Sequence, residues 1–169
     1  MRHSTSYYHS EVYQEFKEIA DNEYRTIIQF FVEYEKEIKQ LEFDEYFELL
    51  LAYADALFET ADYRKHLNIA DLIISITIEQ NIKFYQGKDI FFEILYKKAA
   101  SHFNLMQYDQ SEHIIRELIK MDPNNELTVR FLKKCIRQRK PAYLQSTRAV
   151  SVLLFLLTAL LISIELILI

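Results

Sequence analysis

Apolar residues recur along residues 10–42 at the spacing of an amphipathic helix. They fall in two rows, and within each row neighbours lie about seven residues apart, two turns of a helix. Neither Gly nor Pro interrupts the segment, and Glu and Lys fill most other positions. The rows are Tyr13, Ala20, Ile27, Tyr34 and Leu41, then Tyr24, Phe31 and Ile38. We therefore expect one long helix over 10–42 that packs on later helices, with a free coiled coil as the alternative. Residues 1–9 are expected to be a disordered tip.

The segment 45–125 contains two similar helical patterns. In each, a small residue and then a phenylalanine precede a tyrosine, and a short polar break separates the phenylalanine from the tyrosine. The first pattern has Ala54, Phe58 and Tyr63, and the second has Ala99, Phe103 and Tyr108. Each half therefore predicts a helix–turn–helix hairpin, which must stack on neighbours to bury its apolar face.

Composition favours an all-α fold. The 169 residues include one Gly, two Pro and one Cys. Turn-rich β folds and glycine-rich phosphate loops need more glycine, and a disulfide framework needs more cysteine. The only glycine, Gly87, is expected to end one helix, with Asp89 as the N-cap of the next.

Charge is distributed unevenly along the chain. Residues 1–125 contain 13 basic and 23 acidic residues, a balance of −10, whereas 126–148 contain seven basic residues and one acidic. We expect 126–148 to form a basic cap helix and a juxtamembrane linker. Its basic residues, together expected to contact a membrane surface, are Arg130, Lys133, Lys134, Arg137, Arg139, Lys140 and Arg148.

The run 149–169 is almost wholly apolar, with Glu165 its only charged residue. As a helix it would extend about 31 Å, the thickness of a bilayer's hydrocarbon core. It therefore predicts a transmembrane helix rather than a buried helix of a bundle. The basic flank predicts a cytoplasmic N-terminal domain, and the first 23 residues contain no apolar signal-peptide region. The expectation is a single-pass, tail-anchored membrane protein.

Chemistry-bearing residues show no catalytic or metal pattern. The five histidines have no metal-ligand spacing, and no Cys/His pair stands out. Cys135 is expected to pack in a helix, with palmitoylation as the alternative. The basic run before an apolar segment favours membrane contact over nucleic acid. We expect no enzyme activity, no cofactor and no nucleic-acid partner.

The hairpin pattern resembles the tetratricopeptide repeat. In 92–125, Leu95, Ala99, Tyr108 and Leu118 match the repeat's large, small, aromatic and second small positions, and 121–125 (MDPNN) matches its terminal proline. The 47–80 segment matches more loosely, because His66 replaces a small residue and no proline ends it. The resemblance implies antiparallel helical hairpins stacked as an α-solenoid.

The resemblance also implies a groove lined by the first helix of each hairpin. Four carboxylates and three aromatic rings would face it, so a basic or apolar helical protein segment is the expected partner. If the N-terminal helix fills the groove, the aromatic residues are core instead. The implied groove residues are Glu48, Leu51, Asp55, Phe58, Glu59, Glu93, Tyr96, Ala100, Phe103 and Asn104.

Two functions fit these expectations. The first is a membrane-anchored adaptor or scaffold that presents a cytosolic protein-binding surface. The second is a structural subunit of a membrane complex, a closed helical bundle that forms homo-oligomers through its transmembrane helix.

Overall fold

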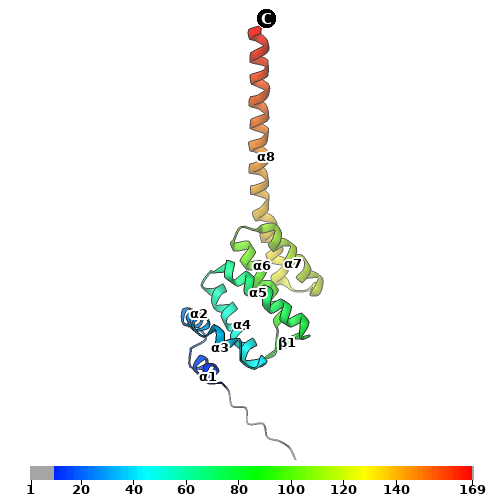
Figure 1. The fold of residues 1–169 in the computed structure, drawn as a ribbon. Helices are drawn as coiled ribbons and strands as arrows, with labels where there is room; N and C mark the ends of the chain where they lie inside the picture. The colour runs from blue at the N-terminus through cyan, green and yellow to red at the C-terminus, as the bar shows by residue number, and fades with distance from the viewer. Residues whose placement is uncertain (1–9, 169) are drawn as a thin grey trace, which may run out of the picture. The chain divides into compact units, whose positions relative to one another are not determined.

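The computed structural model describes residues 10–168, and the side chains of 10–139 and 150–158. The described chain is mostly helical, with one two-stranded hairpin (Figure 1). The prediction of an all-α fold is therefore confirmed apart from that hairpin. In chain order the elements are α1 (Glu11–Lys17), α2 (Tyr24–Glu33), α3 (Glu35–Ile38), α4 (Phe43–Glu59), α5 (Tyr63–Glu79), β1 (Phe84–Tyr85), β2 (Lys88–Asp89), α6 (Ile90–Asn104), α7 (Tyr108–Met121) and α8 (Glu126–Leu168).

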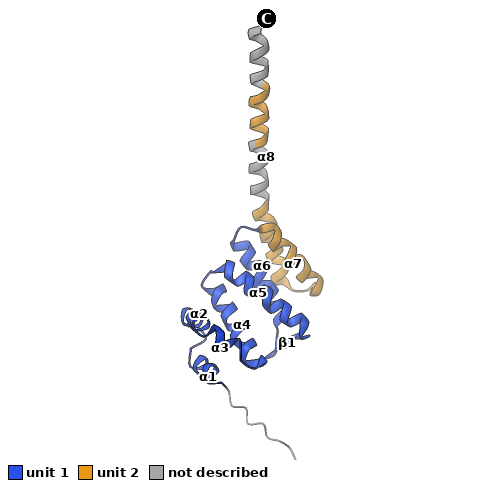
Figure 2. Ribbon diagram, in the orientation of Figure 1, with its two compact units in different colours: residues 1–107 blue, residues 108–169 orange. Residues whose placement is uncertain are grey.

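The chain divides into two compact units, 1–107 and 108–169 (Figure 2). Unit 1 contains α1 to α6, and unit 2 contains α7 and α8. The hairpin predicted over 92–125 corresponds to α6 and α7, which belong to different units. Within unit 1, α5 packs extensively with α6, and within unit 2, α7 packs extensively with α8.

The single helix predicted over 10–42 is broken into three, α1, α2 and α3. The break between α1 and α2 includes Asp21 and Asn22, whose side chains favour turns over helix interiors. Ser10 caps α1, because its side chain accepts a hydrogen bond from the Tyr13 N–H at 3.2 Å. The break lets both arms bury apolar side chains against α4, which one straight helix would not do. The predicted tip, 1–9, lies outside the described residues.

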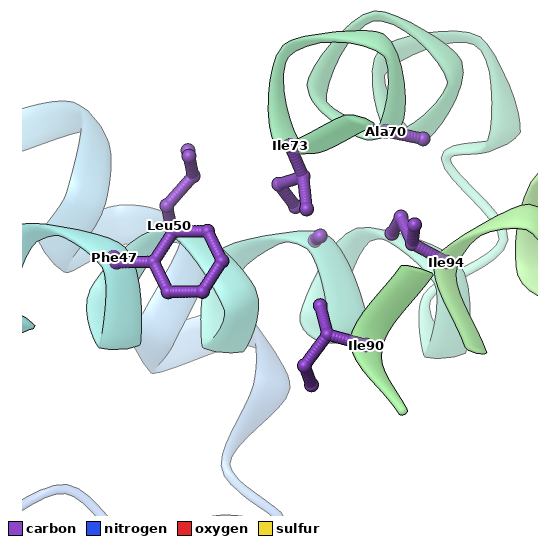
Figure 3. Close-up of a cluster of buried hydrophobic side chains, with 7 residues drawn as sticks. Phe47, Leu50, Ala70, Ile73, Ile90 and Ile94 are labelled. Carbon is purple, nitrogen blue, oxygen red and sulfur yellow. The ribbon is translucent and has the colours of Figure 1, made fainter. Parts of the chain in front are cut away.

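Helix α4 is the centre of unit 1, because both of its sides are buried. On one side, Phe47, Leu50 and Ala54 pack with α5 and α6, whose contributions include Ile73 and Ile94 (Figure 3). On the other side, α4 packs against α1, α2 and α3; the buried residues there are Tyr13, Phe16, Ile27, Ile38, Leu49 and Ala56. Two apolar clusters thus hold α4 in place and leave only a narrow stripe of it for the surface.

The segment between α5 and α6 forms a β-hairpin rather than the helix end predicted at Gly87. Phe84 pairs with Asp89 and Tyr85 with Lys88, in antiparallel register. The two turn residues, Gln86 and Gly87, have φ of 48° and 78°. Positive φ at both positions is the geometry of a type I′ turn, which accounts for the glycine. Asp89 is the N-cap of α6 as predicted, accepting a hydrogen bond from the Phe92 N–H at 3.0 Å.

Three helices of unit 1 end without glycine. Ala61, Asn81 and Met106 follow α4, α5 and α6 and have φ of 61°, 53° and 62°. After α4, the Asp62 N–H donates to the Leu57 carbonyl at 2.9 Å and the Ala61 N–H to the Phe58 carbonyl at 3.0 Å. These paired bonds define a Schellman motif, which glycine usually completes. The chain therefore places ordinary side chains in a left-handed backbone geometry.

Unit 2 is the packing of α7 against the first turns of α8. Helix α7 ends at Met121, directly before Asp122-Pro123, as the sequence predicts. Asn125 then accepts a hydrogen bond from the Thr128 N–H at 3.3 Å, which caps the start of α8. The buried residues of this unit are Ser111, Glu112, Ile115 and Leu118 of α7 and Thr128, Phe131 and Cys135 of α8.

The predicted membrane span over 149–169 is corrected by the structure. Among the residues whose side chains are described, no helix is both long enough and apolar enough to cross a bilayer. The part of the apolar run whose side chains are described, 150–158, accounts for only about 14 Å of helix, whereas a span needs about 20 residues. Side chains 159–169, including Glu165, lie outside the described residues. The expectations of a transmembrane helix and of a tail-anchored, single-pass membrane protein are therefore wrong.

Candidate functional site: an acidic cleft on helix α4

One stripe of α4 lies beside the two apolar clusters, is only partly buried, and lines a cleft in unit 1. The stripe comprises Glu48, Ala52, Asp55 and Glu59, which follow one another at intervals of three or four residues and so share a helix face. Two cavities open on this stripe, of about 180 Å³ and about 330 Å³. Their linings share Glu48, Ala52, Asp55 and Lys88. The small side chain of Ala52 therefore lies where the two cavities meet.

Glu48 ties the cleft to α1. Its Oε2 accepts a hydrogen bond from the Tyr13 hydroxyl at 2.7 Å, and its Oε1 lies 2.7 Å from Lys17 Nζ. Burial raises the pKa of Tyr13, and the hydrogen bond and charge of Glu48 raise it further. Burial also raises the pKa of Tyr85, the aromatic wall of the smaller cavity, and Glu48 and Asp44 add to that effect. Both phenols therefore stay neutral hydrogen-bond donors beside the carboxylate.

Lys97 joins α4 to α6 within the cleft. Its Nζ lies 2.7 Å from Asp55 Oδ1 and 2.9 Å from Glu93 Oε1. Burial by itself would lower the pKa of Lys97, but the charges and hydrogen bonds of Asp55 and Glu93 outweigh burial, so the pKa is raised. Lys97 is therefore a protonated cation with two carboxylates around it.

Three further charged side chains lie at the rim of the cleft. Asp21 and Glu59 line the larger cavity, and Lys88 lines both cavities. All three are exposed. Within the described residues none of the three forms an ion pair, so each carries its charge into solvent. The rim is therefore open to charged groups from outside the protein.

The structure brings some of the groove residues named from sequence to this cleft. Glu48, Leu51, Asp55 and Glu93 line the smaller cavity, and Glu59 lines the larger one. The remaining residues, Phe58, Tyr96, Ala100, Phe103 and Asn104, line neither of these two cavities. The carboxylates of the implied groove thus share one cleft, whereas its aromatic rings do not.

Phe58 faces α5 instead of the cleft. Its ring centroid lies 5.8 Å from that of Tyr63 and 5.3 Å from that of His66. His66 is fully buried, and its Nδ1 lies 2.9 Å from the Ser101 hydroxyl oxygen of α6. Burial, with a smaller effect of Lys97, lowers the pKa of His66 to about 4. His66 is therefore a neutral part of the interface between α5 and α6.

Sequence reasoning missed most of the cleft, because it named five of the 18 residues that line the two cavities. Ala52 could have been found, because it lies between Glu48 and Asp55 on the same face of α4. Lys97 carried a weaker signal, since it follows Glu93 by four residues, the spacing of a helical ion pair. The remaining walls come from α1, α2, the segment between them and the β-hairpin, and no signal in the sequence connected them with α4. Their residues are Phe16, Lys17, Ile19, Asp21, Tyr24, Ile27, Tyr85, Gln86 and Lys88.

The residues predicted to contact a membrane surface lie on α8. Arg130 pairs with Glu126 at 2.6 Å, within the same helix. Arg139 lies 3.0 Å from Glu112 Oε2 and 3.4 Å from Asp109 Oδ1. Lys133, Lys134 and Arg137 are exposed, whereas the side chains of Lys140 and Arg148 lie outside the described residues. With the span corrected, the observed role of Arg139 is to join α8 to α7.

Comparison with known proteins identifies no relative of this chain. No family model matches it, and neither a curated protein nor a solved structure matches it significantly. The resemblance to tetratricopeptide repeats therefore has no support beyond the residues that suggested it. In 10–139 and 150–158, no three His, Cys, Asp or Glu side chains are placed to hold a metal ion.

Proposed function

We propose that unit 1 is a protein-binding module whose cleft on α4 receives a basic, amphipathic segment of a partner protein. The observation that carries the proposal is the composition of the cleft. It combines apolar lining residues with an excess of carboxylates along one helix face.

The apolar wall can receive the apolar face of a helical segment. Leu51 and Ala52 of α4 contribute its partly exposed surface, and Ile90 and Ile94 of α6 lie behind them, almost fully buried. Amphipathic helices bind in grooves of this kind through apolar side chains spaced by one helical turn. The removal of that surface from water supplies the free energy of binding.

The charges favour a basic segment over an acidic one. Five carboxylates line the two cavities against three lysines, a balance of −2. Lys17 and Lys97 are already paired with carboxylates, whereas Asp21 and Glu59 are not paired with a described residue. An approaching cation is therefore attracted, and an acidic segment is repelled.

The test measures binding of two designed peptides to the full chain by fluorescence anisotropy. Both peptides are about 15 residues long, four helical turns, and share the same leucine positions. One carries lysine at its polar positions and the other carries glutamate. We expect the lysine peptide alone to bind, with an affinity that falls as salt is raised. Equal binding of both peptides, or of neither, would contradict the proposal.

Variants locate the binding to the cleft. Glu59→Lys reverses a rim charge and should weaken the lysine peptide about tenfold, through lost attraction and new repulsion. Glu79→Lys makes the same change at an exposed position on α5 that lines neither cavity, and should have little effect. Ala52→Leu should weaken binding without a change of charge, because it fills the junction of the cavities. Circular dichroism of each variant checks its fold.

A structural role is the second candidate, supported by the packing of α1. Tyr13 and Phe16 are buried against α4, so the N-terminal arm already covers part of the helix on which a groove would form. In that case the domain is closed. The peptide experiment separates the two candidates, because a closed domain binds neither peptide.

A further inference from the structure

The two carboxylates that hold Lys97 each use only one oxygen. Lys97 Nζ contacts Asp55 Oδ1 at 2.7 Å and Glu93 Oε1 at 2.9 Å. Among the described residues, the second oxygen of each carboxylate forms no hydrogen bond and no ion pair. The three side chains together carry one net negative charge. The pair of carboxylates therefore keeps two acceptor oxygens for a ligand.

Those carboxylates are more accessible than the ammonium between them. The side chains of Asp55 and Glu93 are 49% and 38% exposed, whereas that of Lys97 is 20% exposed. All three line the smaller cavity, together with the ring of Tyr85 and the apolar side chain of Ile90. A cation that enters from solvent therefore has easier access to the two carboxylates than to the ammonium of Lys97.

We propose that this cavity is an arginine subsite: an arginine side chain of the bound partner segment bridges the free oxygens of Asp55 and Glu93, beside Lys97. The inference rests on the proposed function and specifies the side chain that the cleft recognises. A guanidinium is planar and presents five N–H donors, so it bonds two carboxylate oxygens at once.

Lysine does not satisfy the same geometry. Its ammonium is a compact point charge, and the best position for such a charge, between the two carboxylates, is already occupied by Lys97. A second ammonium there would lie close to the first and be repelled by it. Because Lys97 is already present, the subsite favours the planar guanidinium of arginine over the ammonium of a second lysine.

The rest of the cavity suits the remainder of an arginine side chain. Its methylene stem can pack on the partly exposed side chain of Leu51, and a guanidinium stacks favourably on an aromatic ring such as that of Tyr85. An arginine thus makes contacts along its length, in addition to the bonds at its end.

The experiment compares the leucine–lysine peptide with an otherwise identical leucine–arginine peptide, on the full chain and under the same salt. We expect the arginine peptide to bind about fivefold more tightly, the value of one further charge-assisted hydrogen bond at a half-exposed site. In the double variant Asp55→Asn/Glu93→Gln the preference should disappear. The control Glu79→Gln should keep it.

Lys97→Met gives an independent readout. It removes the resident cation and leaves room for an ammonium between the two carboxylates. We expect the lysine peptide to bind more tightly than it does to the original chain, so that the preference for arginine shrinks. A gain in affinity of this kind does not arise from a loss of folding.

The outcomes separate the subsite from the module. Equal binding of the arginine and lysine peptides to the original chain overturns the subsite and leaves the proposed function standing. Binding of neither peptide overturns both. A preference for arginine that survives in the double variant, or that Lys97→Met leaves unchanged, overturns the assignment to Asp55 and Glu93. If the double variant fails to fold, the Lys97→Met result decides.

Discussion

The two units bury polar groups in different ways. Unit 1 has an apolar cluster on each side of α4, and the polar pair buried between α5 and α6, His66 with Ser101, is neutral. Unit 2 is a pair of helices with a smaller core, and it buries a carboxylate: Glu112 is 5% exposed and lies between Arg116 and Arg139. Both units join helices through ion pairs, but the carboxylates of the pairs in unit 1 are partly exposed, whereas that of unit 2 is buried.

The largest expected effect is a dependence of the stability of unit 1 on pH, through the buried His66 of its neutral pair. The pKa of His66 is lowered from 6.5 to about 4 by burial and Lys97, so the unfolded chain takes up a proton before the folded one does. Above pH 6.5 both forms are neutral and the folded state keeps its full stability. As pH falls from 6.5 to 4, stability is lost, by about 3 kcal/mol from this group.

Urea unfolding across pH 4–7, followed by hydrogen exchange in α5 and α6, measures this loss. His66→Leu removes the titrating group and should flatten the dependence, whereas His113→Gln changes an exposed histidine of unit 2 and should not. If the original chain and His66→Leu show the same dependence on pH, the histidine is protonated within the fold and its burial is not what the structure describes.

The second effect tests the buried carboxylate of unit 2. Glu112 Oε1 lies 2.7 Å from Arg116 Nη2, and its Oε2 lies 3.0 Å from Arg139 Nη1. Glu112→Gln removes the charge that joins α7 to α8, and both arginines, about half exposed, then return to solvent. We expect a loss of about 1–2 kcal/mol, less than for a fully buried pair.

Chemical denaturation, read through amides of α7 and α8, measures that loss. Glu126→Gln is the matched control, because Glu126 and Arg130 have the same helical spacing as Glu112 and Arg116 but are 77% and 73% exposed. Its stability should stay the same. Equal losses in the two variants would mean that burial of Glu112 does not matter and would break the comparison between the units.

The smallest effect concerns how the helices end. Among the described residues, non-glycine residues with positive φ are Ala61, Asn81, Gln86 and Met106, all in unit 1. Unit 2 instead ends α7 before Pro123. Ala61→Gly should stabilise unit 1 by about 0.5 kcal/mol, because relief of left-handed strain exceeds the entropy that glycine adds to the unfolded chain.

Thermal unfolding of single variants measures this gain and compares it with glycine substitutions at other positions. Asn81→Gly should gain less than Ala61→Gly, since asparagine tolerates the left-handed region. Ala100→Gly, inside α6, should destabilise the chain, because glycine there adds only unfolded-state entropy. A loss of stability in Ala61→Gly would show that the methyl group of Ala61 contributes packing greater than its strain.

Local signals predicted the helices well. Apolar spacing placed α4 to α7 near their observed bounds, and the Asp89 cap and the stop before Pro123 follow from backbone chemistry within a few residues. The same reasoning failed at 10–42, because a regular apolar pattern does not reveal whether a helix continues or folds back. It also failed at Gly87, since a residue with positive φ serves a helix end and a hairpin turn equally.

What the sequence by itself determined is therefore the helical class and the acidic face of α4, because residues three and four apart share a face in any helix. Only the tertiary structure decided that this face becomes a cleft. Its walls come from α1, α2, the β-hairpin and α6, which lie far from α4 in sequence, and the ion pairs of Glu48 and Asp55 cross those distances. The same holds for the packing of α7 with α8 within unit 2, since the local pattern does not reveal which neighbouring helices pack together.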